Sequence, residues 1–177
     1  MQVVPALDDF LALASSHTVV PVSIEVLADR ETPVSVFEKL VGDADGFLLE
    51  SVEGGERWAR WSFVGWQPEF TLVARGGKSR TEGGTSEIPE GDPLSVLEAV
   101  LDRFDTPEPE ELGLRPDDVP PLFAGCVGYL AYDVVRYVED LPDQPPDDRG
   151  LPEMVWQFVG CLAAFDRFRQ TVRLIRN

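Results

Sequence analysis

One strand-like segment carries polar side chains that can bind a charged ligand. Between Gly46 and Phe70, an apolar run typical of a buried strand contains Glu50 and Ser51, and it is followed by Arg60 and several aromatic residues. A buried carboxylate is costly unless it is paired, so Glu50 should emerge at a sheet edge or meet a cation. Arg60 is the candidate cation within the chain, and the ammonium group of a ligand is the functional alternative.

A site with these components suits an amino acid. It combines an acid, a hydroxyl, an arginine and apolar walls, which match the charged and apolar parts of such a ligand. Strand alternation places Glu50 and Ser51 on opposite faces of the sheet. Both contact one ligand only at a strand end or a bulge, or if one of them acts through its backbone.

Other reactive residues favour structural roles. His17, the only histidine, follows Ser15 and Ser16, but the sequence places no orienting acid beside it, so we predict no catalytic triad. The adjacent acidic pairs in loop-like segments are expected to be solvated rather than to bind a metal: Glu110-Glu111, Asp117-Asp118 and Asp147-Asp148. We therefore predict no catalytic residue and no metal site.

Glycines and cysteines give no motif for a cofactor. The glycine pairs at 54–55, 76–77 and 83–84 match no phosphate-binding loop and separate strand-like segments, which favours hairpin turns. Cys126 and Cys161 lie in apolar runs without a nearby basic residue, so we interpret them as buried structural thiols. Their spacing suggests neither a zinc site nor a disulfide framework.

Composition narrows the function classes. The 177 residues are 44% hydrophobic, so a core can be buried, and the formal net charge is −17. Such an acidic chain is a poor partner for nucleic acids or anionic membranes, because phosphate contacts require clustered lysine and arginine. The N-terminus lacks the pattern of a signal peptide and no apolar run is long enough to span a bilayer, so we expect a cytoplasmic protein.

The pattern of elements predicts an α+β fold of antiparallel sheets packed with a few helices. Helices are expected at 7–14, at 32–42 and 92–104 behind Thr-Pro and Asp-Pro caps, and from Asp133. Strands are expected at 19–27, in consecutive antiparallel order between 46 and 82, over 122–132, and in a terminal hairpin. An acidic, proline-rich stretch at about 105–121 is expected to be a solvated connection within one domain, residues 1–177.

Five blocks of sequence carry a resemblance to a known family. The chain closely resembles the N-terminal region of anthranilate synthase component I, in order and over nearly its whole length. The blocks are TPVSVFEKL (32–40), FLLESVEGGERWARWSFVGWQP (47–68), GDPLSVLEAVL (91–101), GCVGYLAYDVVRYVEDLP (125–142) and FDRFRQTVRLI (165–175). The sequence departs from the family at Trp61 and Trp66, where relatives often have RYSFIG followed by a non-aromatic residue.

The resemblance implies a regulatory rather than a catalytic chain. The family converts chorismate and glutamine to anthranilate and pyruvate, with Mg2+, in tryptophan biosynthesis, and its active site belongs to a C-terminal chorismate-binding domain that is absent from these 177 residues. We therefore expect this chain alone to be catalytically inactive and to hold no cofactor. Its charge agrees, because chorismate is a dianion.

The resemblance also implies an L-tryptophan inhibitor site and two protein partners. Carried over by position, Glu50 meets the ligand ammonium, Ser51 hydrogen-bonds the ligand or shapes the pocket, and Arg60 faces the ligand carboxylate. The inhibition would be allosteric. The implied partners are the C-terminal chorismate-binding domain and a glutamine amidotransferase subunit.

Two alternatives remain open. The corresponding domain of aminodeoxychorismate synthase component I also fits the LLES segment, and an interaction module that binds no ligand fits the composition.

The block around Gly128, Tyr129, Tyr132, Asp133 and Arg136 is explained equally by close strand packing, with its polar groups satisfied internally, and by an interface with a partner. Loss of the covering domain would expose apolar surface and favour self-association.

Overall fold

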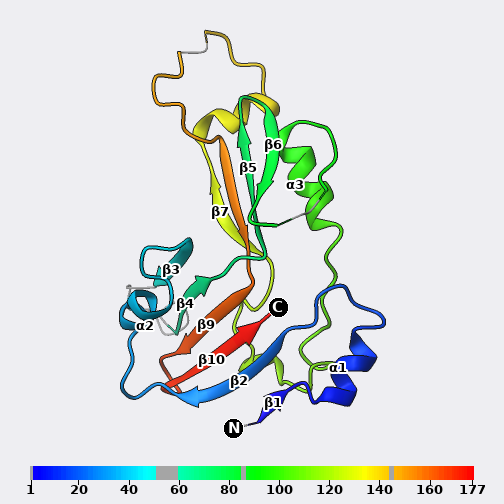
Figure 1. The fold of residues 1–177 in the computed structure, drawn as a ribbon, viewed down its shortest axis with the longest axis vertical. Coiled ribbons are helices and arrows are strands. Elements are labelled where there is room, and N and C mark those ends of the chain that lie inside the picture. The colour runs from blue at the N-terminus through cyan, green and yellow to red at the C-terminus, as the bar shows by residue number, and fades with distance from the viewer. Residues whose placement is uncertain (1, 51–59, 85–86, 144–145) are drawn as a thin grey trace. The chain divides into compact units, whose positions relative to one another are not determined.

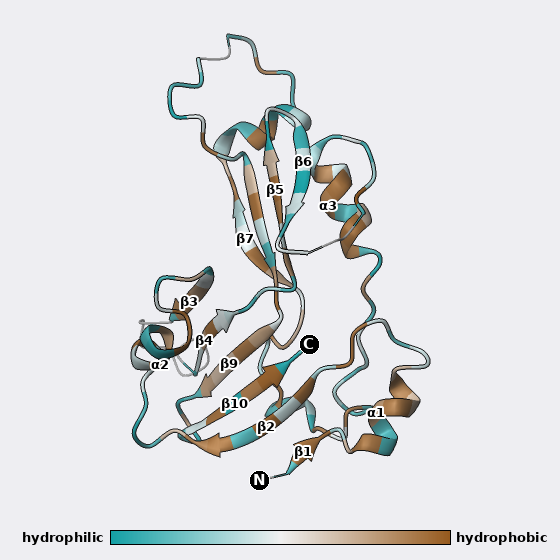
Figure 2. Ribbon diagram, viewed as in Figure 1, coloured by the Kyte–Doolittle hydropathy of each residue, from teal (hydrophilic) through white to brown (hydrophobic). Residues whose placement is uncertain are grey.

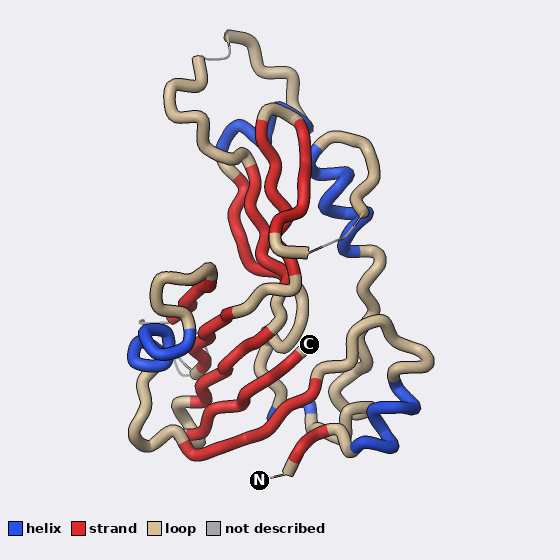
Figure 3. Tube along the Cα trace, in the orientation of Figure 1, coloured by secondary structure: helices blue, strands red, loops and turns tan. Residues whose placement is uncertain are grey.

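The chain divides into two compact units, each built around an antiparallel sheet. The computed structural model describes residues 2–50, 60–84, 87–143 and 146–177. Unit 1 contains residues 1–68, 104–125 and 159–177, and unit 2 contains residues 69–103 and 126–158. Figure 3 shows that strands predominate over helices in both, and the prediction of an α+β fold is confirmed. The prediction that residues 1–177 act as one regulatory domain stays a prediction.

Unit 1 holds a six-stranded sheet in the order β1-β2-β10-β9-β4-β3 (Figure 1). Its neighbouring strands are all antiparallel. The strands are β1 (Val3–Val4), β2 (Val22–Leu27), β3 (Gly46–Glu50), β4 (Trp61–Trp66), β9 (Cys161–Asp166) and β10 (Thr171–Arg176). The C-terminal hairpin β9–β10 is the predicted one, and it pairs Asp166 with Thr171 next to its turn.

Unit 2 holds a four-stranded sheet in the order β6-β5-β8-β7. Its strands are β5 (Phe70–Arg75), β6 (Lys78–Glu82), β7 (Cys126–Leu130) and β8 (Met154–Phe158). Gly76 and Gly77, both at positive φ, form the predicted turn between β5 and β6. The expectation of consecutive antiparallel strands between 46 and 82 is wrong at one step, because β4 pairs with β9 and β5 pairs with β8 in the other sheet.

Local capping residues set the two longer helices. Helix α2 (Pro33–Leu40) begins behind Thr32, whose hydroxyl accepts from the Ser35 N–H in a capping box. Helix α3 (Pro93–Leu101) begins behind Asp92, which accepts from the N–H groups of Leu94 and Ser95. In unit 1, α2 packs its apolar side on the sheet around Val64 and Ala163, and in unit 2, α3 covers Leu72 and Met154.

Three sequence interpretations need correction. The spacing of Leu7, Phe10 and Leu11 predicts that the apolar stripe of helix α1 (Leu7–Leu13) belongs to the core. None of its residues is buried, however, and Leu7 and Leu11 are 71% and 59% exposed; Figure 2 shows the apolar part of the helix in brown. The helix expected from Asp133 is a 3-10 helix, η2 (Tyr132–Tyr137). The stretch at 105–121 is only partly solvated: it contains the 3-10 helix η1 (Pro116–Asp118), and it buries Pro107, Leu112 and Pro120.

Candidate functional site

Glu50 is the last residue of β3, which lies at one end of the six-stranded sheet. Its carboxylate Oε1 lies 3.2 Å from the Nη2 of Arg167, in the turn of the β9–β10 hairpin. The side chains are 28% and 45% exposed. The expectation that Glu50 emerges at an edge or meets a cation is therefore confirmed, but the cation is Arg167 and not Arg60.

Arg60, directly before β4, pairs with Asp166 instead. Its Nε and Nη2 lie 3.0 Å and 2.5 Å from the Asp166 Oδ2, and its guanidinium lies 4.6 Å from the centre of the Trp61 ring. Asp166 is only 3% exposed. Hydrogen bonding to Asp166 raises the pKa of Arg60, so the cation is fixed in its charged form.

Asp166 is buried yet ionised. Burial alone would raise its pKa, but the hydrogen bonds from Arg60 and from the Arg169 N–H outweigh burial and hold the pKa below its usual value. The Asp166 Oδ1 accepts from the N–H groups of Phe168 and Arg169, which closes the hairpin turn. This carboxylate therefore organises both the turn and Arg60.

The hairpin turn thus contacts both described residues of the predicted site. Asp166 binds the Arg60 side chain, the Arg167 N–H donates to the Arg60 carbonyl oxygen at 2.9 Å, and the Arg167 side chain binds Glu50. Sequence reasoning found Glu50 and Arg60 but missed their partners, because these are 117 and 106 residues away along the chain, respectively. Both partners, Asp166 and Arg167, lie in the block FDRFRQTVRLI, whose resemblance to the family was the one sequence feature that pointed to this segment.

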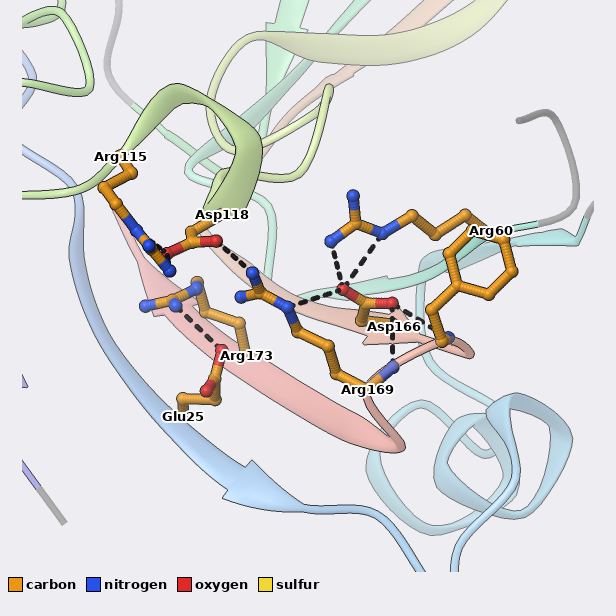
Figure 4. Close-up of polar contacts among 8 residues, drawn as sticks. Glu25, Arg60, Arg115, Asp118, Asp166, Arg169 and Arg173 are labelled. Carbon is orange, nitrogen blue, oxygen red and sulfur yellow. Dashed lines mark hydrogen bonds and ion pairs between the residues drawn. The ribbon is translucent and has the colours of Figure 1, made fainter. Parts of the chain in front are cut away.

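A chain of ion pairs extends from Asp166 across the same region of unit 1 (Figure 4). Arg169 lies 3.9 Å from Asp166 and also binds Asp118 of η1, which in turn pairs with Arg115. Hydrogen bonds from Arg169 and Arg115 lower the pKa of Asp118. The expectation that Asp118 is a freely solvated charge is therefore wrong: it ties the 104–125 segment to the hairpin.

A buried arginine lies on the neighbouring strand. Arg173 of β10 is 8% exposed and donates to the Ser23 hydroxyl at 3.3 Å and to the Glu25 carboxylate at 2.9 Å. A small, mostly apolar pocket lies beside it, lined by residues that include Pro21, Leu112 and Phe123. These contacts join β2 and β10 and give Arg173 a structural role.

The remaining candidate residues lie in varied surroundings. Ser51 lies outside the described residues, so its predicted role stays a prediction. His17 does have an acid beside it, contrary to expectation: its Nδ1 lies 2.7 Å from the Asp105 Oδ2. The hydroxyls of Ser15 and Ser16 instead donate to the carbonyl oxygens of Ala12 and Leu13, so they are held by the helix end rather than by His17.

Both cysteines are free and partly buried, and burial raises the pKa of Cys126 to about 11. A thiol with such a pKa is a weak nucleophile at neutral pH. Across the described ranges, no cluster of three or more histidine, cysteine or acidic side chains is arranged to hold a metal ion. No helix among those residues is long and apolar enough to span a membrane.

The block around Gly128 shows the close packing that the sequence allowed. A Cβ at Gly128 would lie 1.9 Å from the Val155 carbonyl oxygen of β8. Asp133 pairs with Arg136 at 2.9 Å, and the Tyr129 hydroxyl donates to the Pro152 carbonyl oxygen at 3.3 Å. Tyr132, by contrast, is 85% exposed, so its side chain satisfies no buried group.

Comparison with known proteins finds relatives that match nearly the whole of this chain. It is 44% identical over 173 residues to anthranilate synthase component 1 of Mycolicibacterium smegmatis and 42% identical over 174 residues to that of Mycobacterium tuberculosis, each time over 96% of this chain. The protein of the same name from Acetivibrio thermocellus is 35% identical over 98% of the chain. The chain is a homologue of the N-terminal region of anthranilate synthase component I. It spans about a third of the length of these relatives: 32%, 33% and 34%.

A solved structure agrees on the fold. Anthranilate synthase component I from Streptococcus pneumoniae TIGR4 superposes with a TM-score of 0.51 at 20% identity, over 86% of this chain and 31% of that one. No family model matches the chain. The sequence relatives confirm the resemblance to component I, and the solved structure supports the fold alone.

Proposed function

We propose that this chain is the regulatory N-terminal region of an anthranilate synthase component I and contributes its L-tryptophan inhibitor site. The observation that carries the proposal is the identity of 35–44% to anthranilate synthase component 1 over 96–98% of the chain. The position of Glu50 supports it. A partly exposed carboxylate at the end of an edge strand is accessible to a ligand ammonium, whereas a carboxylate deep in the core would not be.

The proposed contacts are those of the LLES segment and the following arginine. Glu50 binds the ligand ammonium, Ser51 hydrogen-bonds the ligand or shapes the pocket, and Arg60 supplies positive potential toward the carboxylate. Chemistry on chorismate, with Mg2+ and ammonia from a glutamine amidotransferase subunit, belongs to a chorismate-binding domain that completes component I. The chain on its own is then catalytically inactive. In the assembled enzyme, bound L-tryptophan favours one arrangement of the domains, and this arrangement is the inhibited one.

Calorimetric titration of the chain with L-tryptophan tests the ligand site. D-tryptophan and L-phenylalanine serve as controls for stereochemistry and for the indole ring. Heat with L-tryptophan alone supports the proposal. If none of the three ligands gives heat, the titration is repeated on the chain joined to the chorismate-binding region of the Mycolicibacterium smegmatis relative. If the joined protein gives no heat of binding either, the result favours an interaction module that binds no ligand.

The same joined protein tests whether the chain confers inhibition by L-tryptophan. With chorismate, ammonia and Mg2+, the proposal predicts anthranilate formation that L-tryptophan suppresses, and the complete Mycolicibacterium smegmatis component 1 is the control. Anthranilate formation that L-tryptophan does not suppress would overturn the regulatory part of the proposal. Tight tryptophan binding without any inhibition would favour the role expected in aminodeoxychorismate synthase component I.

A further inference from the structure

We propose that the ion pair between Glu50 and Arg167 is the receptor for the two charges of an amino acid, with Arg167 binding the ligand carboxylate. This inference rests on the proposed function, which supplies the ligand, but the residue and its mode of action come from the geometry. An α-amino acid carries one ammonium and one carboxylate on the same carbon. A paired carboxylate and guanidinium present the complementary charges side by side.

The pair is open to exchange. Glu50 and Arg167 meet at 3.2 Å through a single contact, and both side chains remain accessible to water. Ion pairs of this kind contribute little to stability, typically below about 1 kcal/mol. A ligand can therefore replace the contact at small cost, placing its ammonium on Glu50 and its carboxylate on Arg167.

Arg60 is less suited to the carboxylate contact. Its Nε and Nη2 both bind Asp166, its guanidinium stacks on Trp61, and the Asp166 carboxylate is buried. Releasing Arg60 to a ligand would take the nearest cation from that buried carboxylate and leave Arg169 at 3.9 Å, which is costly. Arg167 carries no such penalty, so it is the exchangeable cation of the two.

The backbone places Arg167 where exchange can occur. Its N–H is held by the Arg60 carbonyl oxygen at 2.9 Å, and the preceding Asp166 fixes the turn through the N–H groups of Phe168 and Arg169. The side chain is therefore anchored at its base, while its tip contacts Glu50 at the surface. A long, flexible arginine side chain on a rigid backbone can move its guanidinium from Glu50 to a ligand carboxylate without moving the strand.

Three ligands and two variants separate the charges. L-tryptophan carries both, tryptamine lacks the carboxylate, and indole-3-propionate lacks the ammonium. For the wild-type chain we expect L-tryptophan to bind more tightly than either analogue. In Arg167→Gln we expect the dissociation constant of L-tryptophan to rise about tenfold, the size of a charge-assisted contact, while tryptamine binding stays the same or improves. In Glu50→Gln we expect the preference for L-tryptophan over indole-3-propionate to disappear.

Controls distinguish this role from a structural one. Arg167→Lys should restore much of the preference for L-tryptophan over tryptamine, because it keeps the charge. Lys39→Gln removes an exposed ion pair with Glu31 in the same unit and should leave all three dissociation constants unchanged. The melting temperature of each variant, measured alongside, identifies any loss of folding.

The outcomes separate the two proposals. If the wild-type chain binds L-tryptophan and Arg167→Gln binds it equally well, this inference is wrong while the inhibitor site stands. If Arg60→Gln, folded, abolishes the preference for L-tryptophan over tryptamine and Arg167→Gln does not, the carboxylate contact belongs to Arg60. If neither the wild-type chain nor the joined protein described above binds any of the three ligands, both the ligand site and this inference fail.

Discussion

Arg60 and Asp166 are 106 residues apart in the sequence, yet two guanidinium nitrogens of Arg60 bind one carboxylate oxygen of Asp166. The pair closes β4 against the end of β9, strands that also share a backbone ladder from Trp61 to Trp66. Because Asp166 is buried, removing either partner leaves the other charge without its closest counter-ion, which costs stability. The contact therefore tests how unit 1 is stabilised.

Asp166→Asn should destabilise the chain substantially. The substitution removes the charge that neutralises Arg60 and weakens the acceptor of two turn N–H groups. We expect the free energy of unfolding to fall by roughly 3 kcal/mol, measured by urea denaturation. Glu82→Gln removes an exposed pair with Arg80 on β6 and is the matched control, with an expected loss below about 1 kcal/mol. Equal effects in the two variants would contradict a special role for Asp166.

The contribution of Asp166 should depend on pH with a definite sign. Its pKa in the folded chain is lowered, so the carboxylate binds its proton more weakly there than in the unfolded chain. The stability that it contributes is present above the unfolded pKa of about 3.9 and is lost as pH falls through the folded value. Denaturation at a series of pH values should show a constant gap between wild type and Asp166→Asn from pH 7 to about 5, narrowing below about 4. A gap that widens in acid would reverse the assignment.

Gly128→Ala should weaken unit 2. The added Cβ would lie 1.9 Å from the Val155 carbonyl oxygen and 2.8 Å from the Trp156 Cα, both of which are backbone atoms of β8. Backbone atoms cannot rotate away, so β7 must shift, and we expect a loss of roughly 1–3 kcal/mol in a thermal melt or denaturant titration. Gly83→Asn, at a φ of +79° with open space around it, is the control. An unchanged melting temperature for Gly128→Ala would show that β7 tolerates displacement.

Leu130→Lys should reduce self-association of the isolated chain. Strand β7 ends the sheet of unit 2 and exposes Tyr129 and Leu130, whereas the opposite edge strand β6 carries Lys78, Arg80 and Glu82. Charged edge strands resist pairing with another chain, and apolar edge strands invite it. Light scattering across a concentration series should therefore show a smaller average mass for Leu130→Lys than for wild type. Leu151→Lys, at an exposed site outside any strand, is the comparison, and an equal decrease there would point to net charge alone.

Ser51→Arg tests the predicted inhibitor site at its other end. In component I containing this segment, a bulky cation in place of Ser51 should obstruct the ligand and repel its ammonium, while the distant chemistry on chorismate continues. We expect anthranilate formation at the wild-type rate with L-tryptophan inhibition reduced at least tenfold, on the order of one charge-assisted contact. Inhibition identical to that of wild type would remove Ser51 from the site.

The sequence predicts what short-range rules control. The Thr32-Pro33 and Asp92-Pro93 caps locate the starts of α2 and α3, because a capping side chain and its helix are only a few residues apart. The terminal hairpin is likewise local. The separation of β4 and β5 into different sheets is not, since it depends on pairing with β9 and β8 about 80 to 100 residues later.

The same distinction applies to the candidate site. Glu50 stands out in the sequence as an acid in an apolar run, and the need for a cation follows from its charge. Its actual partner, Arg167, cannot be chosen from sequence, because 15 arginines and lysines compete and register decides among them. Arg60 was the candidate chosen from the segment that follows Glu50, but in the folded chain it pairs with Asp166.

The backbone passes between the two units four times, after residues 68, 103, 125 and 158. Consequently, a single cut at any of these points gives no fragment that consists of one complete unit. Replacing unit 2 with that of a homologue would require two inserted segments and four junctions. We therefore expect recombination between related genes to exchange the two units together, so that their sequences diverge together.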